Sequence, residues 1–410
     1  MQAIMAESKR DIAQSTSLVE RVFLHTPEPS SSAAIYVFEI VRGLSERGVR
    51  VDVICPANHD MIENFKSNPL VSVHASAARS TDGSHGILEK LYKNAAFLFS
   101  SCGVLFGAIR RDQVVHFQYA MHLPFAAIFF LVALLRGSKV VFTAHDPLPH
   151  KWLLNKNLRW MEKGALSWMY KVSDLIIVHS DSGKRTIQNN FPHASGKVEV
   201  IEHGPYELGK SLVQAPQTGT LELLLFGALR ENKGGDLAIQ AVQRLHKRGI
   251  PIRLTIAGRV LNRKEQDFWD RCKGLIAECP GPIRLIEEFI PESQLPELFA
   301  DCHCFILPYG QFFSDSGVAF MALANGRPVL TTPAGGLKEL LQASQGGLLI
   351  KSATVDDVEE AIRCAVELGP IGLEKLGKDG MEWVLRECGW PKVAAKTVEA
   401  YSAVVLSKQK

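Results

Sequence analysis

The chain of 410 residues is longer than one hydrophobic core usually serves, so we expect two domains of about 200 residues each. Apolar residues make up 46% of the chain and charged residues 22%, a balance that excludes wholesale disorder. The net charge of +3 is too small to indicate a nucleic-acid partner.

The first strand is expected at 21–25 and the first helix at 33–46, where apolar side chains recur on one face. Further strands of the N-terminal half are expected at 51–55, 114–118, 139–145, 174–180 and 197–204. Apolar, β-branched runs separated by helices predict a parallel sheet that is covered on both faces.

Two apolar runs in this half, 95–109 and 123–135, fall short of the roughly 20 residues that span a bilayer, so we predict two buried helices. The segment 150–171 then places five basic residues beside three tryptophans and one acid. Basic residues interleaved with tryptophan can hold a helix on an anionic membrane surface, so we expect peripheral contact with the inner face of the cell membrane. A helix that packs its tryptophans inward is the alternative.

A polar stretch that contains proline and glycine, 205–220, is typical of a linker. After it the alternation restarts, with strands expected at 221–227, 252–258, 283–290, 303–308, 327–332 and 346–350. Two α/β units in series predict two Rossmann-like domains that face each other across a cleft. Ligands of such sheets bind beyond the carboxyl ends of the strands, so the strand-to-helix loops are where a site is expected.

The loop "FGALRENKGG" (226–235) is the first of these in the second half. Gly227 permits a tight turn, and Arg230 and Lys233 lie three residues apart at a helix entrance. A planar guanidinium and a compact ammonium together suit a diphosphate. The alternative is an exposed basic turn, because surface Arg and Lys are common.

A second loop, "SDSG" (314–317), directly precedes an apolar helix. A helix N-terminus leaves backbone N–H groups unpaired and carries the positive end of the dipole, so it can bind an anion. Serine and aspartate are also the preferred N-caps of any helix, so this segment alone fits a simple cap equally well.

The eight cysteines are scattered, many of them inside apolar segments, which fits reduced thiols in a cytoplasmic protein better than disulfides or a zinc site. The first twenty residues contain charges and no continuous apolar core, so they do not resemble a secretory signal. The chain has no Asp-x-Asp pair, no Walker A sequence, no HExxH and no GxGxxG after a strand. We therefore expect neither a metal nor a cofactor.

Several segments, in their order and spacing, resemble GT-B glycosyltransferases, in particular glycosyltransferase family 4. They include "FGALRENKGGDLAIQAVQRL", "IAGR" and "SDSGVAFMALANGRPVLTTPAGGLKELL" in the second half, and "TAHDP" and "SDLIIVHSDSGKRTI" in the first. The segment 389–405 is similar to the closing helix of that fold, which crosses back onto the first domain. The resemblance implies an acceptor domain at 1–207, a donor domain at 208–390 and the closing helix at 391–410.

The resemblance also implies roles for individual residues. Arg230 and Lys233 would neutralise the departing diphosphate, and His145, in "TAHDP", would contact the donor sugar near the reacting carbon; these three are the catalytic candidates. The donor-binding candidates are Gly227, Arg230, Lys233, Phe289, Ile290, Asp315, Ser316, Gly317, Val318 and Glu339. His203 is expected to pack at the hinge.

The sequence departs from the family at its paired glutamates. Phe313 stands at the first of these positions and Met321 at the second, and a methionine does not accept hydrogen bonds from ribose hydroxyls as a carboxylate does. The segment instead resembles a subgroup with Ser-Gly before the helix. Among family relatives the arginine of the first loop also more commonly follows the glycine directly.

The function implied by the resemblance is transfer of a sugar from a nucleotide diphosphate sugar to a hydroxyl of a glycan or lipid-linked acceptor. Retention at the anomeric carbon and a place in glycan, glycolipid or polysaccharide biosynthesis are expected with it. An inverting transferase or a nucleotide-sugar epimerase on the same fold is an alternative. A catalytically silent scaffold subunit is another, because the glutamates are missing.

Overall fold

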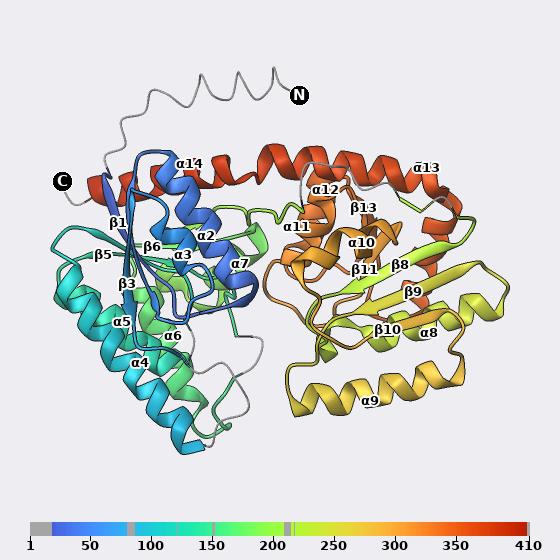
Figure 1. Cartoon of the computed structure of the whole chain (residues 1–410), viewed down its shortest axis with the longest axis horizontal. Helices are drawn as coiled ribbons and strands as arrows, with labels where there is room; N and C mark the ends of the chain where they lie inside the picture. Colours follow the sequence, from blue (N-terminus) through green and yellow to red (C-terminus); the bar gives the residue numbers. More distant parts are fainter. Residues whose placement is uncertain are drawn as a thin grey trace.

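Two parallel sheets, one in each half of the chain, organise the protein (Figure 1). The computed structural model describes residues 19–79, 87–120, 122–149, 152–208, 215–216 and 218–407. Every strand pairing within the two sheets is parallel. The structure therefore confirms the predicted pair of Rossmann-like domains.

The N-terminal sheet has seven strands in the order β3-β2-β1-β4-β5-β6-β7. Their bounds are β1 Arg21–His25, β2 Arg50–Pro56, β3 Val71–Ser76, β4 Val114–Phe117, β5 Lys139–Thr143, β6 Leu175–Val178 and β7 Val198–Val200. Edge strand β3 was not among the predicted strands. Its sequence "VSVHAS" is half exposed and lacks the continuous apolar run of a strand that is buried on both faces.

Helices cover both faces of this sheet. Their bounds are α2 Ser31–Glu46, α3 Ile62–Lys66, α4 Ile87–Ala108, α5 Leu123–Leu135, α6 Arg159–Val172 and α7 Asp181–Asn190, followed by the 3₁₀ turn η1 Pro192–Lys197. One apolar core holds α2 against one face of the sheet, and a second core holds α4, α5 and α6 against the other.

Helices α4 and α5 correct one prediction. Both apolar runs are helical as expected, but each helix buries only one face, and Phe99 and Leu135 remain 76% and 70% exposed. Within the part of the chain that the structure describes, no helix is both long and apolar enough to cross a membrane. The sequence pattern did not indicate the exposed face, because α5 is apolar all round and its periodicity carries no contrast.

The C-terminal sheet has six strands in the order β10-β9-β8-β11-β12-β13. The strands are β8 Leu221–Phe226, β9 Ile252–Ala257, β10 Ile283–Ile286, β11 Cys304–Leu307, β12 Val329–Thr331 and β13 Gly347–Leu349. The helices are α8 Gly235–Lys247, α9 Arg263–Glu278, α10 Leu295–Ala300, α11 Gly317–Ala324, α12 Leu337–Ser344 and α13 Val355–Glu387, with 3₁₀ turns η2 Glu231–Lys233 and η3 Glu292–Gln294. The order of β8, β9 and β11 places the carboxyl ends of β8 and β11 side by side.

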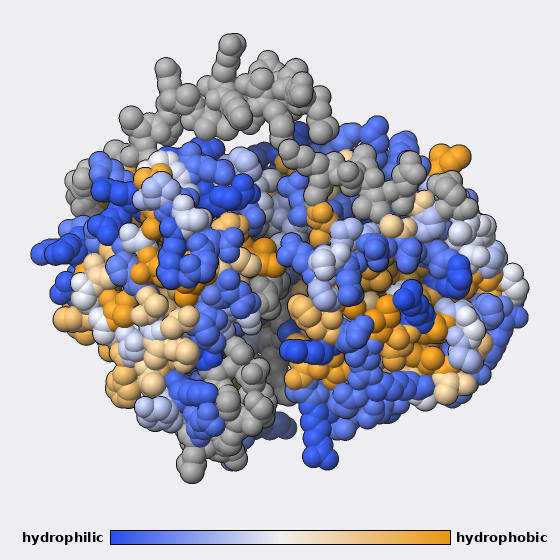
Figure 2. All heavy atoms as spheres, in the orientation of Figure 1, coloured by the Kyte–Doolittle hydropathy of each residue, from blue (hydrophilic) through white to orange (hydrophobic). Residues whose placement is uncertain are grey.

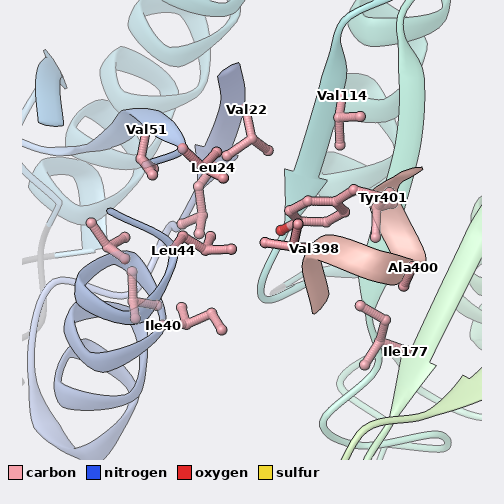
Figure 3. Packing of buried hydrophobic residues seen from close by; sticks show 14 of the residues in the cluster. Val22, Leu24, Ile40, Leu44, Val51, Val114, Ile177, Val398, Ala400 and Tyr401 are labelled. Carbon is pink, nitrogen blue, oxygen red and sulfur yellow. The ribbon is translucent and has the colours of Figure 1, made fainter. Parts of the chain in front are cut away.

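Helix α14 (Trp390–Leu406) returns to the N-terminal half, as expected for the closing helix. Helix α13 kinks at Gly369, which has φ +65°, and is followed by α14, and the two run along one side of both domains (Figure 1). Val398, Ala400 and Tyr401 of α14 belong to the buried cluster that also holds strand and α2 residues (Figure 3). The closing helix is therefore part of the N-terminal core.

Trp390 is the anchor of this crossing. Its ring is 5% exposed, packs edge-on against Tyr36 at 5.2 Å between centroids, and donates from Nε1 to the Pro205 carbonyl at 2.8 Å. A Cβ atom at Gly204 would lie 2.5 Å from the same ring, so any larger side chain at this position would clash with the indole.

We predict that Trp390→Ala lowers the free energy of unfolding by about 3–5 kcal/mol, the usual cost of deleting a buried aromatic side chain. Urea denaturation measures the loss. Ile371→Ala is the matched control, because Ile371 is 85% exposed and its truncation is expected to cost less than about 0.5 kcal/mol. Equal effects of the two substitutions would contradict the anchoring role.

Candidate functional site

The turn after β8 brings Lys233 beneath the end of the strand. Gly227 has φ +101°, a conformation that favours glycine, and a Cβ atom there would lie 2.8 Å from Lys233 Nζ. The Lys233 ammonium donates to the Phe226 carbonyl at 3.0 Å. Gly227 therefore provides both the turn and the space that the lysine occupies.

Lys233 is a partly buried cation. Burial, together with the charge of Arg230, lowers the pKa of its ammonium to about 7. Among the described residues no carboxylate forms an ion pair with it, and Arg230 beside it is exposed. A buried cation that lacks a counter-ion is costly, so this loop has the charge of an anion site.

The N-terminus of α11 adjoins this loop. The Ser316 hydroxyl caps the helix by accepting from the Ala319 N–H at 3.3 Å, and it lies 2.9 Å from the Tyr309 hydroxyl. A Cβ atom at Gly227 would also approach Val318 Cγ2 to 3.3 Å. The structure thus brings Gly227, Lys233, Ser316 and Val318 together, as expected for two halves of one site.

Asp315 faces the other domain. Burial raises the pKa of its carboxyl to about 7, while a hydrogen bond with Ser180 opposes the rise. A Cβ atom at Gly336 would lie 2.0 Å from Asp315 Oδ1 and 2.7 Å from Ser180 Cβ. Ser180 and Gly336 were not among the predicted site residues, although the "GG" at 335–336 was visible in the sequence.

Three further contacts cross between the domains. The Ser314 hydroxyl donates to the Asp146 carboxylate. Glu339 accepts from the Ser182 N–H at 3.1 Å and forms an ion pair with Arg185 at the start of α7. Glu339, expected near the donor, is therefore occupied here with the N-terminal domain, and its role toward a ligand stays a prediction.

A group of histidines lies on the N-terminal side of the cleft. His145 follows β5, and His179 follows the neighbouring strand β6. His179 Nε2 lies 3.0 Å from His145 Nδ1, and His179 Nδ1 lies 2.9 Å from the Ile201 carbonyl. His203, buried between the halves, stacks on Phe320 of α11 at 5.6 Å, consistent with the expected packing at the hinge.

These contacts assign the tautomers of His145 and His179. Burial lowers the pKa of both imidazoles, that of His179 to about 4, so both rings are neutral at pH 7. A carbonyl only accepts, so His179 Nδ1 carries its proton and His179 Nε2 accepts from His145 Nδ1–H. His145 Nε2 is then a bare acceptor, buried and without a hydrogen-bond partner among the described residues.

Tyr119 fixes the plane of the His145 ring by stacking on it at 4.1 Å with an interplanar angle of 5°. Neither Tyr119 nor His179 was predicted from the sequence. The available signal was "IIVHS", which ends its strand in a histidine as "VVFTAH" does. Carboxyl ends of adjacent parallel strands meet at one sheet edge, so the two histidines could have been paired on this ground.

A cavity of about 290 Å³ opens in the N-terminal domain beside His145 and Asp146. Its walls come from the ends of β4 and β5, the start of α5, and α6 with the segment before it. The lining residues include Gln118, Tyr119, Leu123, Leu153, Glu162 and Leu166. The cavity is mostly apolar, with the polar groups of His145 and Asp146 among its walls.

Phe289 and Ile290 follow β10 at the same edge of the C-terminal sheet, where Phe289 is 68% exposed and Ile290 packs against the core. Met321 also packs against this core from α11. Of the three tryptophans in 150–171, Trp160 of α6 is exposed, whereas Trp152 and Trp168 pack against the N-terminal core.

Comparison with known proteins matches both halves to sugar-transferring enzymes. Residues 33–204 match the model described as Glycosyltransferase Family 4, and residues 220–367 match the model described as Glycosyl transferases group 1. The glycogen synthase of Mycobacterium tuberculosis (strain CDC 1551 / Oshkosh) is 27% identical over 58% of this chain, and the match spans only 56% of that relative's length. The D-inositol 3-phosphate glycosyltransferase of Nocardiopsis dassonvillei is 24% identical over 94% of both chains.

Solved structures share the fold. The sucrose-phosphate synthase of Thermosynechococcus elongatus superposes with a TM-score of 0.73 at 15% identity, covering 93% of this chain and 98% of that one. Anabaena HepE in complex with UDP-glucose gives a TM-score of 0.69 at 13% identity, covering 93% and 99%.

We predict that His145 Nε2 resonates as an unprotonated nitrogen at pH 7 in long-range ¹H–¹⁵N spectra. His179→Phe removes the acceptor of the Nδ1 proton and is expected to shift His145 toward the Nε2–H tautomer. His179→Gln is the conservative control, since an amide can donate to the Ile201 carbonyl and accept from His145. A protonated Nε2 in the unmodified protein would contradict the assignment.

Proposed function

Because this chain is a GT-B glycosyltransferase similar to family 4, we propose that it moves a sugar from a nucleotide diphosphate sugar to an acceptor hydroxyl with retention at the anomeric carbon. The observation that carries the proposal is Lys233, a partly buried ammonium that pairs with no carboxylate among the described residues and adjoins the N-terminus of α11. A diphosphate supplies the missing counter-charge. Solved neighbours with this fold include complexes with UDP and UDP-glucose.

In the proposed reaction the bond between the anomeric carbon and the diphosphate oxygen breaks, and a bond to the acceptor oxygen forms on the same face. The acceptor proton passes to the departing phosphate. Arg230 and Lys233 neutralise the charge that grows on this leaving group, and the N–H groups at 316–318 add hydrogen bonds to it. Such preorganised groups act most strongly where closure excludes water.

His145 and Asp146 lie on the N-terminal side of the proposed site, where His145 contacts the donor sugar near the reacting carbon. The bare Nε2 of His145 is suited to accept a hydrogen bond from a sugar hydroxyl. The cavity beside it has room for an acceptor headgroup. Asp146, which also lines this cavity, accepts a hydrogen bond from Ser314 across the cleft.

We propose the class of acceptor and the location of the protein on the same basis. The acceptor is a glycan or a lipid-linked molecule in glycan, glycolipid or polysaccharide biosynthesis. The protein acts in the cytoplasm, in peripheral contact with the inner face of the cell membrane through 150–171. Exposed Trp160 and the basic residues Lys156 and Lys163 of this segment support that contact.

We predict that Lys233→Ala lowers kcat/KM for donor turnover by about 100-fold or more, because it removes a group that neutralises the leaving diphosphate. The measurement is release of nucleoside diphosphate from a panel of nucleotide sugars. Lys247→Ala is the matched control, since Lys247 is an exposed lysine at the end of α8. If no nucleotide sugar is turned over and none of the nucleoside diphosphates binds in calorimetry, the scaffold alternative replaces this proposal.

We also predict that nucleoside diphosphate binding weakens between pH 7 and pH 9. The free Lys233 ammonium has a pKa of about 7, so above that pH it must take up a proton to bind the anion, and affinity falls by up to about tenfold per pH unit. The terminal phosphate ionises near pH 6, so its own charge is constant over this range.

Lys233→Arg keeps the positive charge at every pH and is expected to flatten the calorimetric pH profile. The Asp315 carboxyl has a raised pKa of about 7 and adds repulsion in the same direction, so Asp315→Asn is combined with Lys233→Arg to remove the residual slope. An affinity that is independent of pH in the unmodified protein would count against diphosphate binding at Lys233.

A further inference from the structure

Exposed apolar side chains are concentrated on one part of the N-terminal domain. Of eighteen large apolar side chains that are exposed in the described residues, eleven lie between Tyr92 and Met161. They are carried by α4, α5, the segment that leads into α6 and the first turn of α6. Figure 2 shows apolar residues among hydrophilic ones at the lower left, where Figure 1 places α4 and α5, and further apolar residues on the C-terminal domain.

Helix α5 has a continuous apolar stripe on its outward face. All of its exposed side chains are large and apolar: Phe125, Ile128, Leu131 and Leu135. The opposite face packs into the core, and the helix contains no charged residue. An outward helix face in water is normally polar, so this stripe needs an apolar neighbour.

Helix α4 continues the surface. Tyr92, Phe99 and Phe106 are exposed and seven residues apart, which places them along one side of the helix. No exposed residue of α4 between 92 and 107 is charged. Arg136, at the end of α5, places its guanidinium 4.7 Å from the centre of the Phe106 ring and donates to the Ile109 carbonyl, which ties the two helices together.

The charge of this region sets it apart from the rest of the chain. Residues 87–172 contain eleven Lys and Arg against four Asp and Glu, a net charge of +7 in a chain of net charge +3. Arg110, Arg111 and Arg136 lie at one end of the two helices. An apolar surface with basic residues around it matches the interface of an anionic bilayer, where aromatic side chains enter the headgroup region and cations remain with the phosphates.

We propose that this surface, called the α4–α5 face and made of Tyr92, Phe99, Phe106, Phe125, Ile128, Leu131 and Leu135, docks on a lipid bilayer that contains anionic lipids. The contact lies on the membrane and does not span it. A second copy of the chain is a poorer occupant, because it would bring two regions of +7 together. The face extends the expected contact of 150–171 to a much larger apolar area.

The docked orientation also defines a class of acceptor, and this step rests on the proposed transferase function. Leu123 at the start of α5 and Leu153, which is exposed, line the cavity that contains His145. The cavity therefore opens at the N-terminal end of α5, two residues before Phe125 of the α4–α5 face. An amphiphilic acceptor held in the bilayer by its lipid can place its headgroup in this cavity without leaving the membrane.

Flotation with vesicles tests the docking. The full chain is expected to float with vesicles of phosphatidylcholine and phosphatidylglycerol, and far less with phosphatidylcholine alone or at high salt. Phe99→Asp combined with Leu131→Asp is expected to lower the partition coefficient about tenfold or more, because two charges enter the apolar contact. Ile371→Asp, on an exposed isoleucine of the C-terminal domain, is the matched control and is expected to bind as the unmodified chain does.

Thermal unfolding checks that the double variant is folded, and Arg110→Glu with Arg111→Glu provides a second variant that leaves the apolar stripes intact. Loss of flotation in both variants supports docking. The proposal is overturned if the unmodified chain does not float with either vesicle, or if Phe99→Asp with Leu131→Asp floats as well as the unmodified chain. It is also overturned if light scattering shows that the unmodified chain is a dimer, that Phe99→Asp with Leu131→Asp is a monomer, and that neither binds vesicles.

Donor turnover separates this proposal from the proposed function. Vesicle-independent release of nucleoside diphosphate is expected to be unchanged in Phe99→Asp with Leu131→Asp, because neither residue belongs to the donor or acceptor site. Transfer to a glycolipid acceptor embedded in the vesicles is expected to fall with flotation. Flotation without any donor turnover would leave the docking face standing and refute the transferase proposal.

Discussion

The contact of Trp390 with the N-terminal domain is the constraint on which the arrangement of the two halves depends. The indole lies against Gly204, Tyr36 and the Pro205 carbonyl at the point where the chain leaves the first domain. It thereby joins the beginning of the linker to the beginning of α14. The pairs that cross the cleft, Ser314 with Asp146 and Glu339 with Arg185, can form only when this junction holds the sheets in one orientation.

Polar groups that lack a hydrogen-bond or ion-pair partner lie on both sides of the proposed site. In the C-terminal domain, Lys233 is partly buried and its ammonium donates to the Phe226 carbonyl, with no carboxylate paired to it among the described residues. In the N-terminal domain, His145 Nε2 is buried and has no hydrogen-bond partner among the described residues. Each costs folding free energy that a ligand can recover. They complement each other chemically, because one side supplies a cation for phosphate and the other a neutral acceptor for hydroxyls. The α4–α5 face is an exposed apolar surface, and α5 begins at the cavity that opens beside His145.

Most of the fold could be predicted from the chain. Buried parallel strands are continuous apolar runs, so nearly every strand was located within a few residues, and β3 was missed because an edge strand is only half buried. The proposed donor loops were visible for a similar reason, since the glycine turn, the Arg-x-x-Lys spacing and the serine cap act within ten residues. By contrast, Ser180 and Tyr119 carry no local pattern that distinguishes them from ordinary strand-end residues, and His179 offers only the weak signal of a histidine at a strand end.

The sequence by itself therefore determined the two α/β units and the basic turn at Gly227, because periodicity and turn chemistry are properties of short segments. The closing helix was expected from the resemblance to the family. Only the tertiary structure decided which strand ends meet. The bond between His145 and His179 joins residues 34 apart, and that between His116 and Tyr401 joins residues 285 apart. The tertiary structure likewise decided that α4 and α5 each expose one face with large apolar side chains. In an all-apolar helix every face is equivalent until packing buries one of them.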